Sequence, residues 1–128
     1  MTPELTTLVY AVILLIMHLL VQASVSDLSK GLGWALGSRD ERREPSVLAG
    51  RLERALRNFL ETFPAFAALA IVLAVADRST GLSVLGAQVY LFARIAYVVV
   101  TATGIPYLRS GAWIASMAGL VLMLLALL

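Results

Sequence analysis

The chain has 128 residues, of which 60% are hydrophobic and 14% charged, and its mean hydropathy is +0.89. Soluble domains are roughly 45–50% apolar and 25% charged, and a chain this short cannot bury such a surplus of apolar side chains in one core. This composition excludes an ordinary soluble enzyme and a disordered chain, and a net charge of +2 does not indicate a nucleic-acid partner. Because the sequence contains no cysteine, it lacks disulfides, thiolate metal ligands and a thiol nucleophile of its own.

The first predicted element is an uncharged apolar stretch over about residues 5–25, long enough to cross a bilayer as a helix. A secretory signal peptide is the alternative, but residues 1–4 lack the basic residues that begin such a peptide. We therefore expect a retained membrane span. His18 is alone in this stretch, with no His or carboxylate at ligand spacing, so we expect a hydrogen-bonded structural histidine and no metal site.

A polar loop follows over about residues 27–46, and it opens the part of the chain where charge is concentrated. Thirteen of the eighteen charged residues lie between Asp27 and Glu61. Pro45 disfavours helix before it, and Ser46 can cap the helix that follows. The sequence therefore predicts a membrane protein with one polar segment that runs into the second span.

The second predicted span, about residues 47–76, carries a polar face in its first half. At about 100° per residue, one side of a helix holds Arg51, Arg54, Asn58 and Glu61. Asn58 and Glu61 lie roughly 16–21 Å along this helix, and polar groups at such depth usually face a bundle interior or a water-filled cavity. We favour a functional pocket. A structural ion pair between Arg57 and Glu61 is the alternative, and Arg51 fits a solvated first turn equally well.

The third and fourth predicted spans, about residues 82–103 and 107–128, add further polar groups. Arg94 lies near the middle of the third span, where Asn58 or Glu61 is the natural partner. Tyr97 shares its face and could donate a hydrogen bond to an anion, whereas for Tyr90 we favour packing between helices. Arg109 and Ser110 begin the fourth span, either as an anchor at the membrane interface or as one wall of a pocket.

Short connections between the spans predict an all-α, up-down, four-helix membrane bundle over residues 1–128, in one domain. The first and third connections hold most of the basic loop residues, whereas the second holds Arg78 alone. The positive-inside rule then places the first and third connections in the cytoplasm and both termini on the other side of the membrane.

The pattern Arg54-x-x-x-Asn58-x-x-Glu61, with Arg57 and Pro64 beside it, resembles the second helix of the MAPEG family, the membrane-associated proteins in eicosanoid and glutathione metabolism. The family's four spans, its polar first loop and its Arg-Ser pair near the start of the fourth helix are also similar. This resemblance covers most of the chain. Two features depart from the family pattern: Thr101 stands where a Tyr is common, and no Arg ends the first span.

The resemblance implies a homotrimer that binds glutathione as cosubstrate between neighbouring subunits. It implies that the cofactor-binding residues are Arg54, Arg57, Asn58, Glu61, Arg94 and Tyr97, and that Arg109 and Ser110 activate the thiol. A thiol brought by the ligand agrees with the absence of cysteine.

We therefore expect a glutathione-dependent transferase or peroxidase of the lipid bilayer, in a bacterial inner membrane, acting on lipophilic electrophiles or hydroperoxides, with no nucleic-acid partner. The alternative is a non-enzymatic protein, either a small transporter or a lipid-binding assembly. A transporter of this length is expected to carry a carboxylate deep in its first span, where this chain has none.

Overall fold

The computed structural model describes all 128 residues and consists of helices joined by short connections. The four long helices are α1 (Pro3–Lys30), α3 (Val47–Val75), α4 (Gly81–Thr103) and α5 (Pro106–Leu127), and a short helix, α2 (Leu32–Leu36), lies in the first connection. Each long helix is long and apolar enough to cross a membrane. The predicted all-α, four-span bundle is confirmed, and the chain is a multi-pass membrane protein.

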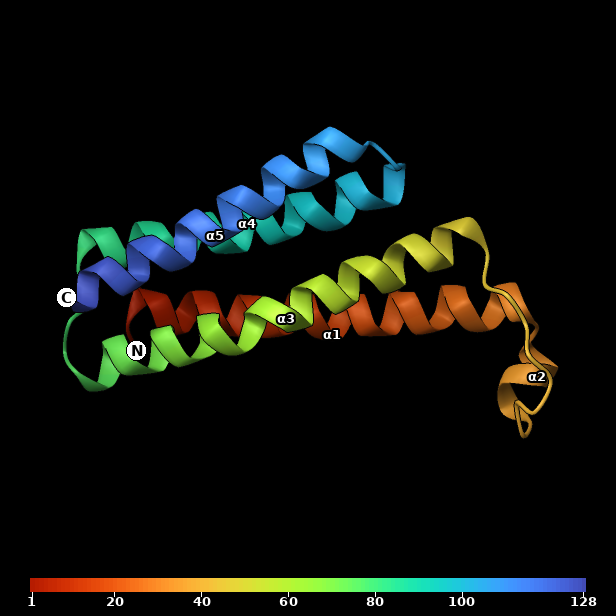
Figure 1. Cartoon of the computed structure of the whole chain (residues 1–128). Helices are drawn as coiled ribbons and strands as arrows, with labels where there is room; N and C mark the ends of the chain where they lie inside the picture. Colours follow the sequence, from red (N-terminus) through yellow and green to blue (C-terminus); the bar gives the residue numbers. More distant parts are fainter.

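The bundle consists of two antiparallel hairpins, α1 with α3 and α4 with α5 (Figure 1). Both chain ends and the turn at residues 76–80 lie together, at what we call the terminal end. The segment 31–46 and the turn at residues 104–105 lie at the opposite, loop end. Every polar residue of the predicted site is therefore found between the loop end and the middle of the bundle.

The first helix is longer than the sequence suggested. It continues through Asp27 to Lys30 and ends at Gly31, whose φ of 101° lies in the region that favours glycine. The loop also contains α2, which was not predicted. Its Trp34 lies beneath two cations, with Lys30 Nζ 5.2 Å and Arg39 Cζ 5.7 Å from the ring centroid, so the polar loop is folded against the end of α1.

The starts of the helices follow from local sequence signals. Thr2, Ser46 and Thr80 each accept a hydrogen bond from a backbone N–H in the first turn of the helix that follows. Pro106 opens α5, where its missing N–H costs nothing. Pro64 does not end α3, which continues as a helix to Val75.

The tightest packing lies toward the terminal end and draws on all four long helices. Its fully buried apolar side chains are Ala11, Phe66, Ala70, Leu73, Ala87, Tyr90 and Met123. Tyr90 stacks on Phe66 with ring centroids 4.2 Å apart, and its hydroxyl shares a 2.8 Å hydrogen bond with Thr62 Oγ1. The preference for Tyr90 as a packing residue agrees with this arrangement.

A buried carboxylate fastens the start of α1 to the start of α4. Glu4 is fully buried and accepts hydrogen bonds from Ser79 Oγ at 2.9 Å and from Ser83 Oγ. Ser83 also forms a capping box with Thr80. The terminal end is thus held by packing and by a closed polar cluster.

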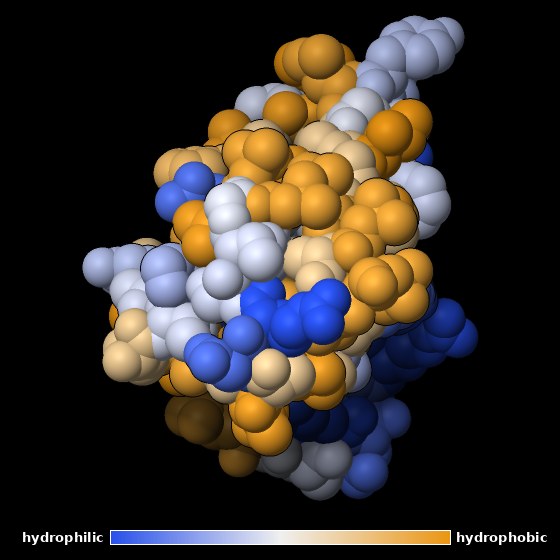
Figure 2. Space-filling view, turned by 90° about the vertical axis from the view of Figure 1, so that its left-hand side faces the viewer, coloured by the Kyte–Doolittle hydropathy of each residue, from blue (hydrophilic) through white to orange (hydrophobic).

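The outer surface is apolar. Figure 2 looks onto the terminal end and shows hydrophobic side chains over much of the surface, with a hydrophilic group near the middle of this face and others in the more distant part. On α1 the exposed side chains include Tyr10, Ile13, Ile16, Met17 and Leu20. Such a surface is stable in contact with lipid rather than water.

Candidate functional site

The largest cavity between the two hairpins lies among α3, α4 and α5. It has a volume of about 390 Å³ and is lined by Asn58, Tyr97, Arg109, Ser110, Trp113 and Ile114. Four of these six residues were predicted as site residues. The fold therefore brings together polar groups that are more than 50 positions apart in the sequence.

A second cavity of about 130 Å³ adjoins the first at the loop end. Its lining residues are Arg51, Arg54, Thr101, Gly104, Ile105, Pro106 and Arg109. Arg109 lines both cavities, so together they form one polar cleft, which we call the arginine cleft. It runs from the loop end toward the middle of the bundle.

Arg94 lies directly behind the arginine cleft, in contact with Asn58 and Tyr97, which line it. Its side chain is fully buried, and its Nη1 donates a 2.9 Å hydrogen bond to Asn58 Oδ1. Its guanidinium carbon lies 4.5 Å from the Tyr97 ring centroid and 5.3 Å from that of Phe59. Of the two partners predicted for Arg94, the structure selects Asn58, and it leaves Nε and Nη2 of Arg94 without a hydrogen-bond partner.

The nine arginines of the chain differ in whether a carboxylate oxygen lies close enough to form an ion pair. Four have a carboxylate oxygen within 4.0 Å: Arg39, Arg42, Arg43 and Arg57. The other five have none: Arg78 lies at the terminal end, whereas Arg51, Arg54, Arg94 and Arg109 line the arginine cleft or lie directly behind it. Several positive charges without a counter-charge repel one another, and an anion in the cleft relieves that repulsion.

Two predicted site residues lie outside the cleft in the single chain. Arg57 pairs with Glu53 at 3.5 Å, and its side chain is 69% exposed. The alternative structural pair between Arg57 and Glu61 is not formed, and Glu61 is exposed with no ion pair. For Arg57 the reason is rotation around the helix, since it lies about 100° from Asn58 on α3.

Arg109 and Ser110 stand on the first turn of α5, where both are exposed. Because Arg109 lines both cavities and Ser110 the larger one, the structure favours their role as a wall of the cleft over that of an interface anchor alone. Trp113, one turn further along α5, was missed from the sequence, although its i+4 spacing from Arg109 places both on one face.

Arg51, like Trp113, lines the cleft although it is not among the site residues predicted from the sequence. Its side chain is half-buried, its Nη1 donates to the carbonyl oxygen of Ala102 at 3.4 Å, and its guanidinium lies against Gly104. It is therefore not part of a solvated first turn. Helical spacing placed it on the polar face of α3 with Arg54, and the structure decides between the two alternatives left open for it.

His18 lies on α1 and packs against α3. Its Nε2 forms a 3.0 Å hydrogen bond with the carbonyl oxygen of Leu52, and the small cavity beside it is otherwise lined by apolar side chains. This agrees with the prediction of a hydrogen-bonded structural histidine.

A comparison with protein families decides the classification. The model of the MAPEG family matches residues 7–128, nearly the whole chain. The protein belongs to the MAPEG family. No curated protein gave a significant match. The MAPEG family includes glutathione transferases and related membrane proteins, and its members generally use glutathione.

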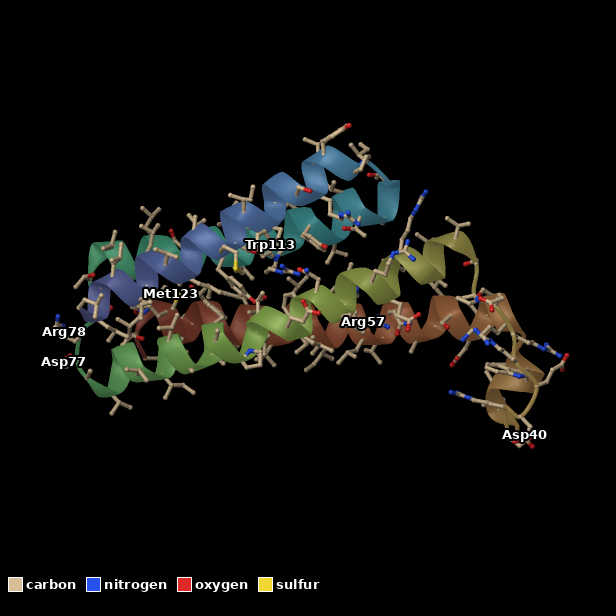
Figure 3. The ribbon with its side chains drawn as sticks, viewed as in Figure 1. Asp40, Arg57, Asp77, Arg78, Trp113 and Met123 are labelled. Atoms are coloured by element: carbon tan, nitrogen blue, oxygen red, sulfur yellow. The ribbon has the colours of Figure 1, made fainter.

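The MAPEG assignment confirms the resemblance drawn from the second-helix pattern. Of that pattern, Arg54 and Asn58 reach the arginine cleft, whereas Glu61 lies on the outer surface of α3. Figure 3 shows Arg57 on α3 and Trp113 on α5 in the same view, with Trp113 on the side of α5 that is turned toward α3. The single chain thus carries most of the polar set in one place.

Proposed function

We propose that this MAPEG protein is a glutathione-dependent membrane transferase or peroxidase that acts on lipophilic electrophiles or hydroperoxides. One observation carries the proposal: four of the five arginines that lack a carboxylate partner line one cleft or lie directly behind it, beside Asn58, Tyr97 and Ser110. Such a cleft suits an anionic ligand with further hydrogen-bonding groups.

Glutathione matches the chemistry of this cleft. It carries a carboxylate at each end, which Arg54 and Arg109 can balance in charge. The Oδ1 of Asn58 is taken by Arg94, so the Nδ2 group of Asn58 is left to donate to a peptide carbonyl. The Tyr97 hydroxyl can donate to the sulfur. Family membership supports the same ligand.

The chemical step is stabilisation of a thiolate. A nearby positive charge favours the ionised form of a thiol, so Arg109 lowers the pKa of the glutathione sulfur, and Ser110 can donate a hydrogen bond to it. The thiolate then attacks an electrophilic carbon, a C–S bond forms, and the leaving group departs with its electron pair. With a hydroperoxide, the sulfur attacks the terminal oxygen, an S–O bond forms as the O–O bond breaks, and the alkoxide leaves and takes a proton to become an alcohol. A second glutathione thiol then displaces water from the sulfenic acid and forms the disulfide.

The active form in this proposal is a homotrimer in which the cleft lies at a subunit boundary. Arg57 and Glu61, both exposed on a single chain, then face that boundary and reach the ligand from it. The loop end faces the cytoplasm of a bacterial inner membrane, in accord with its basic residues. Both termini lie on the other side, and residues 1–128 form one four-span domain.

No observation favours a transporter or a lipid-binding assembly in the same way. The one fully buried carboxylate, that of Glu4, is engaged by Ser79 and Ser83 at the terminal end. A carboxylate held in this manner supports packing rather than ion transport.

Ligand binding and turnover by the purified protein test the proposal. Glutathione and its S-methyl derivative should both raise the thermal stability of the protein, whereas only glutathione should react with a lipophilic electrophile. Arg109→Ala should lower turnover by about 100-fold. Arg78→Ala is the matched control, because Arg78 also lacks a carboxylate partner but lies at the terminal end.

Two results would overturn the proposal. If neither compound changes thermal stability and no turnover is found, the protein is not a glutathione-dependent enzyme. If Glu61→Gln leaves glutathione binding unchanged, the assignment of Glu61 to the site is wrong. Native mass spectrometry in detergent tests the trimer separately, and a single-chain mass with full binding would refute it.

A further inference from the structure

Arg51 links the start of α3 to the turn between α4 and α5. Its Nη1 donates to the carbonyl oxygen of Ala102 at 3.4 Å, in the last turn of α4. Its guanidinium also fills the space beside Gly104: a Cβ added there would lie 2.7 Å from Arg51 Cζ and from Nη2. Arg51 thus occupies the position that any side chain at residue 104 would need.

The contact suits the end of a helix. The last carbonyl oxygens of α4 have no partners within the helix, and a cation is favourable there because of the helix dipole. Gly104 has φ +82° and caps α4 with its own N–H on the carbonyls of Val100 and Thr101. Glycine is required here for this backbone angle and also for the guanidinium that lies against it.

Arg51 is the outermost of three side-chain hydrogen bonds that join α3 to α4. From the terminal end toward the loop end, the pairs are Thr62 with Tyr90, Asn58 with Arg94, and Arg51 with Ala102. The first two pairs are buried deep in the bundle, whereas the third lies at the loop end, away from the Glu4 cluster. Arg51 is therefore the hydrogen-bonding tie that holds the loop end of the α4–α5 hairpin against α3.

The turn held by Arg51 carries the activating residue of the proposed reaction. Only residues 104 and 105 separate α4 from α5, and Arg109 lies in the first turn of α5. Pro106 at the start of α5 has a fixed φ and stiffens this connection. A shift of the turn therefore moves Arg109 with it.

We propose that Arg51 is a positioning residue that holds the α4–α5 turn against α3 and so fixes Arg109 at the distance from the thiol that ionisation requires. The role rests on the proposed glutathione-dependent function. This positioning role differs from direct binding of a glutathione carboxylate. For direct binding, the positive charge of Arg51 alone would be sufficient. Its contact with Gly104 separates the two roles experimentally.

Steady-state kinetics distinguish positioning from direct binding. Arg51→Ala should lower kcat about tenfold, with a smaller change in the KM for glutathione, because the misplaced Arg109 stabilises the thiolate less well. Arg51→Lys keeps the charge but loses the planar group, and it should also lower kcat. A raised KM with unchanged kcat in Arg51→Ala, or full activity in Arg51→Lys, would overturn the proposal.

Gly104→Asn approaches the same contact from the other side. Asn tolerates a positive φ better than other side chains, so the main effect of this substitution is its Cβ, which displaces the guanidinium without removing its charge. It should lower kcat as Arg51→Ala does, and the double variant should be no worse than either single one. Gly81→Ala is the control, since no atom lies within 4 Å of a Cβ at that position. Additive losses in the double variant would contradict the shared contact.

A distance measurement tests the tie independently of glutathione. Because the chain has no cysteine, spin labels can be placed through Val47→Cys on α3 and Tyr107→Cys on α5, both at well exposed positions. With labelled chains diluted by unlabelled ones, Arg51→Ala should lengthen and broaden the distance between the labels. An unchanged distance refutes the positioning role, even if the protein binds glutathione. If the distance lengthens but the protein does not bind glutathione, Arg51 still holds the turn against α3, whereas the proposed function is refuted.

Discussion

Arg94 is the most costly side chain in the structure. A fully buried guanidinium gives up several kcal/mol of hydration. Part of this is offset by the hydrogen bond to Asn58 and by the rings of Tyr97 and Phe59, each ring contributing about 0.5–2 kcal/mol. Because two of its nitrogen atoms remain without partners, Arg94 contributes little to stability, which accords with the proposed role beside the ligand.

Replacing Arg94 should separate these two contributions. Arg94→Met keeps a similar volume without charge, so we expect thermal stability to be equal or higher, because buried charges are often replaced by apolar residues without loss. Glutathione affinity should fall at least tenfold, since Asn58 loses the partner that orients it. Thermal unfolding and calorimetric titration measure both. A variant that is strongly destabilised but binds normally would assign Arg94 to the fold instead.

Ser83 has the opposite balance, because its hydroxyl serves the fold alone. Ser83→Ala removes a buried donor to Glu4 and one half of the capping box, and we expect a loss of about 1–3 kcal/mol in the free energy of unfolding in detergent. Ser29→Ala is the control, since both hydrogen bonds of the Ser29 hydroxyl, to Ser26 O and from Ser46 N–H, are exposed. Equal stability of the two variants would argue against the Glu4 cluster as a fastening of the bundle.

At the scale of elements, the α4–α5 hairpin depends on two glycines that allow the helix backbones to touch. A Cβ at Gly119 would lie 2.6 Å from the carbonyl oxygen of Gly86 and 2.8 Å from the backbone nitrogen of Tyr90. Close approach through small residues is the usual way in which membrane helices associate. Ala112, Ser116 and Gly119 follow one another at helical spacing on α5, and Ser116 and Gly119 are buried.

Adding one methyl group at this crossing should force the helices apart. Gly119→Ala is expected to cost about 1–3 kcal/mol in the free energy of unfolding, because backbone atoms cannot move aside. Gly111→Ala on the same helix meets no atom within 4 Å and should be neutral or slightly stabilising. Chemical denaturation in detergent compares the two. A neutral Gly119→Ala would show that the helices do not pack this closely.

The four spans could be predicted because length and apolar composition alone decide what crosses a bilayer. The end of α1 could not be placed, because polar residues such as Asp27 and Lys30 are compatible with both helix and loop, and Gly31 alone ends the helix. The shared face of Arg54 and Asn58 followed from helical spacing. The contact of Arg51 with Gly104 did not, because it depends on which helix ends meet in space.

At the scale of the whole molecule, packing and polarity are separated along the membrane axis. The terminal end contains the apolar core and the Glu4 cluster, whereas the loop end contains the arginine cleft and fewer constraints. Figure 1 shows the two hairpins diverging toward the loop end. A rigid base that carries a less constrained, positively charged end is suited to binding an anionic cosubstrate beside the lipid.

The central claim is that the arginine cleft binds glutathione as a thiolate, and ultraviolet difference absorbance of the purified protein tests it most directly. At saturating glutathione and neutral pH, the wild type should show the absorbance of a bound thiolate in proportion to the number of sites, S-methylglutathione should give none, and Arg109→Ala should lose most of it. Glutathione bound with no thiolate signal, or a signal unchanged in Arg109→Ala, would contradict the account.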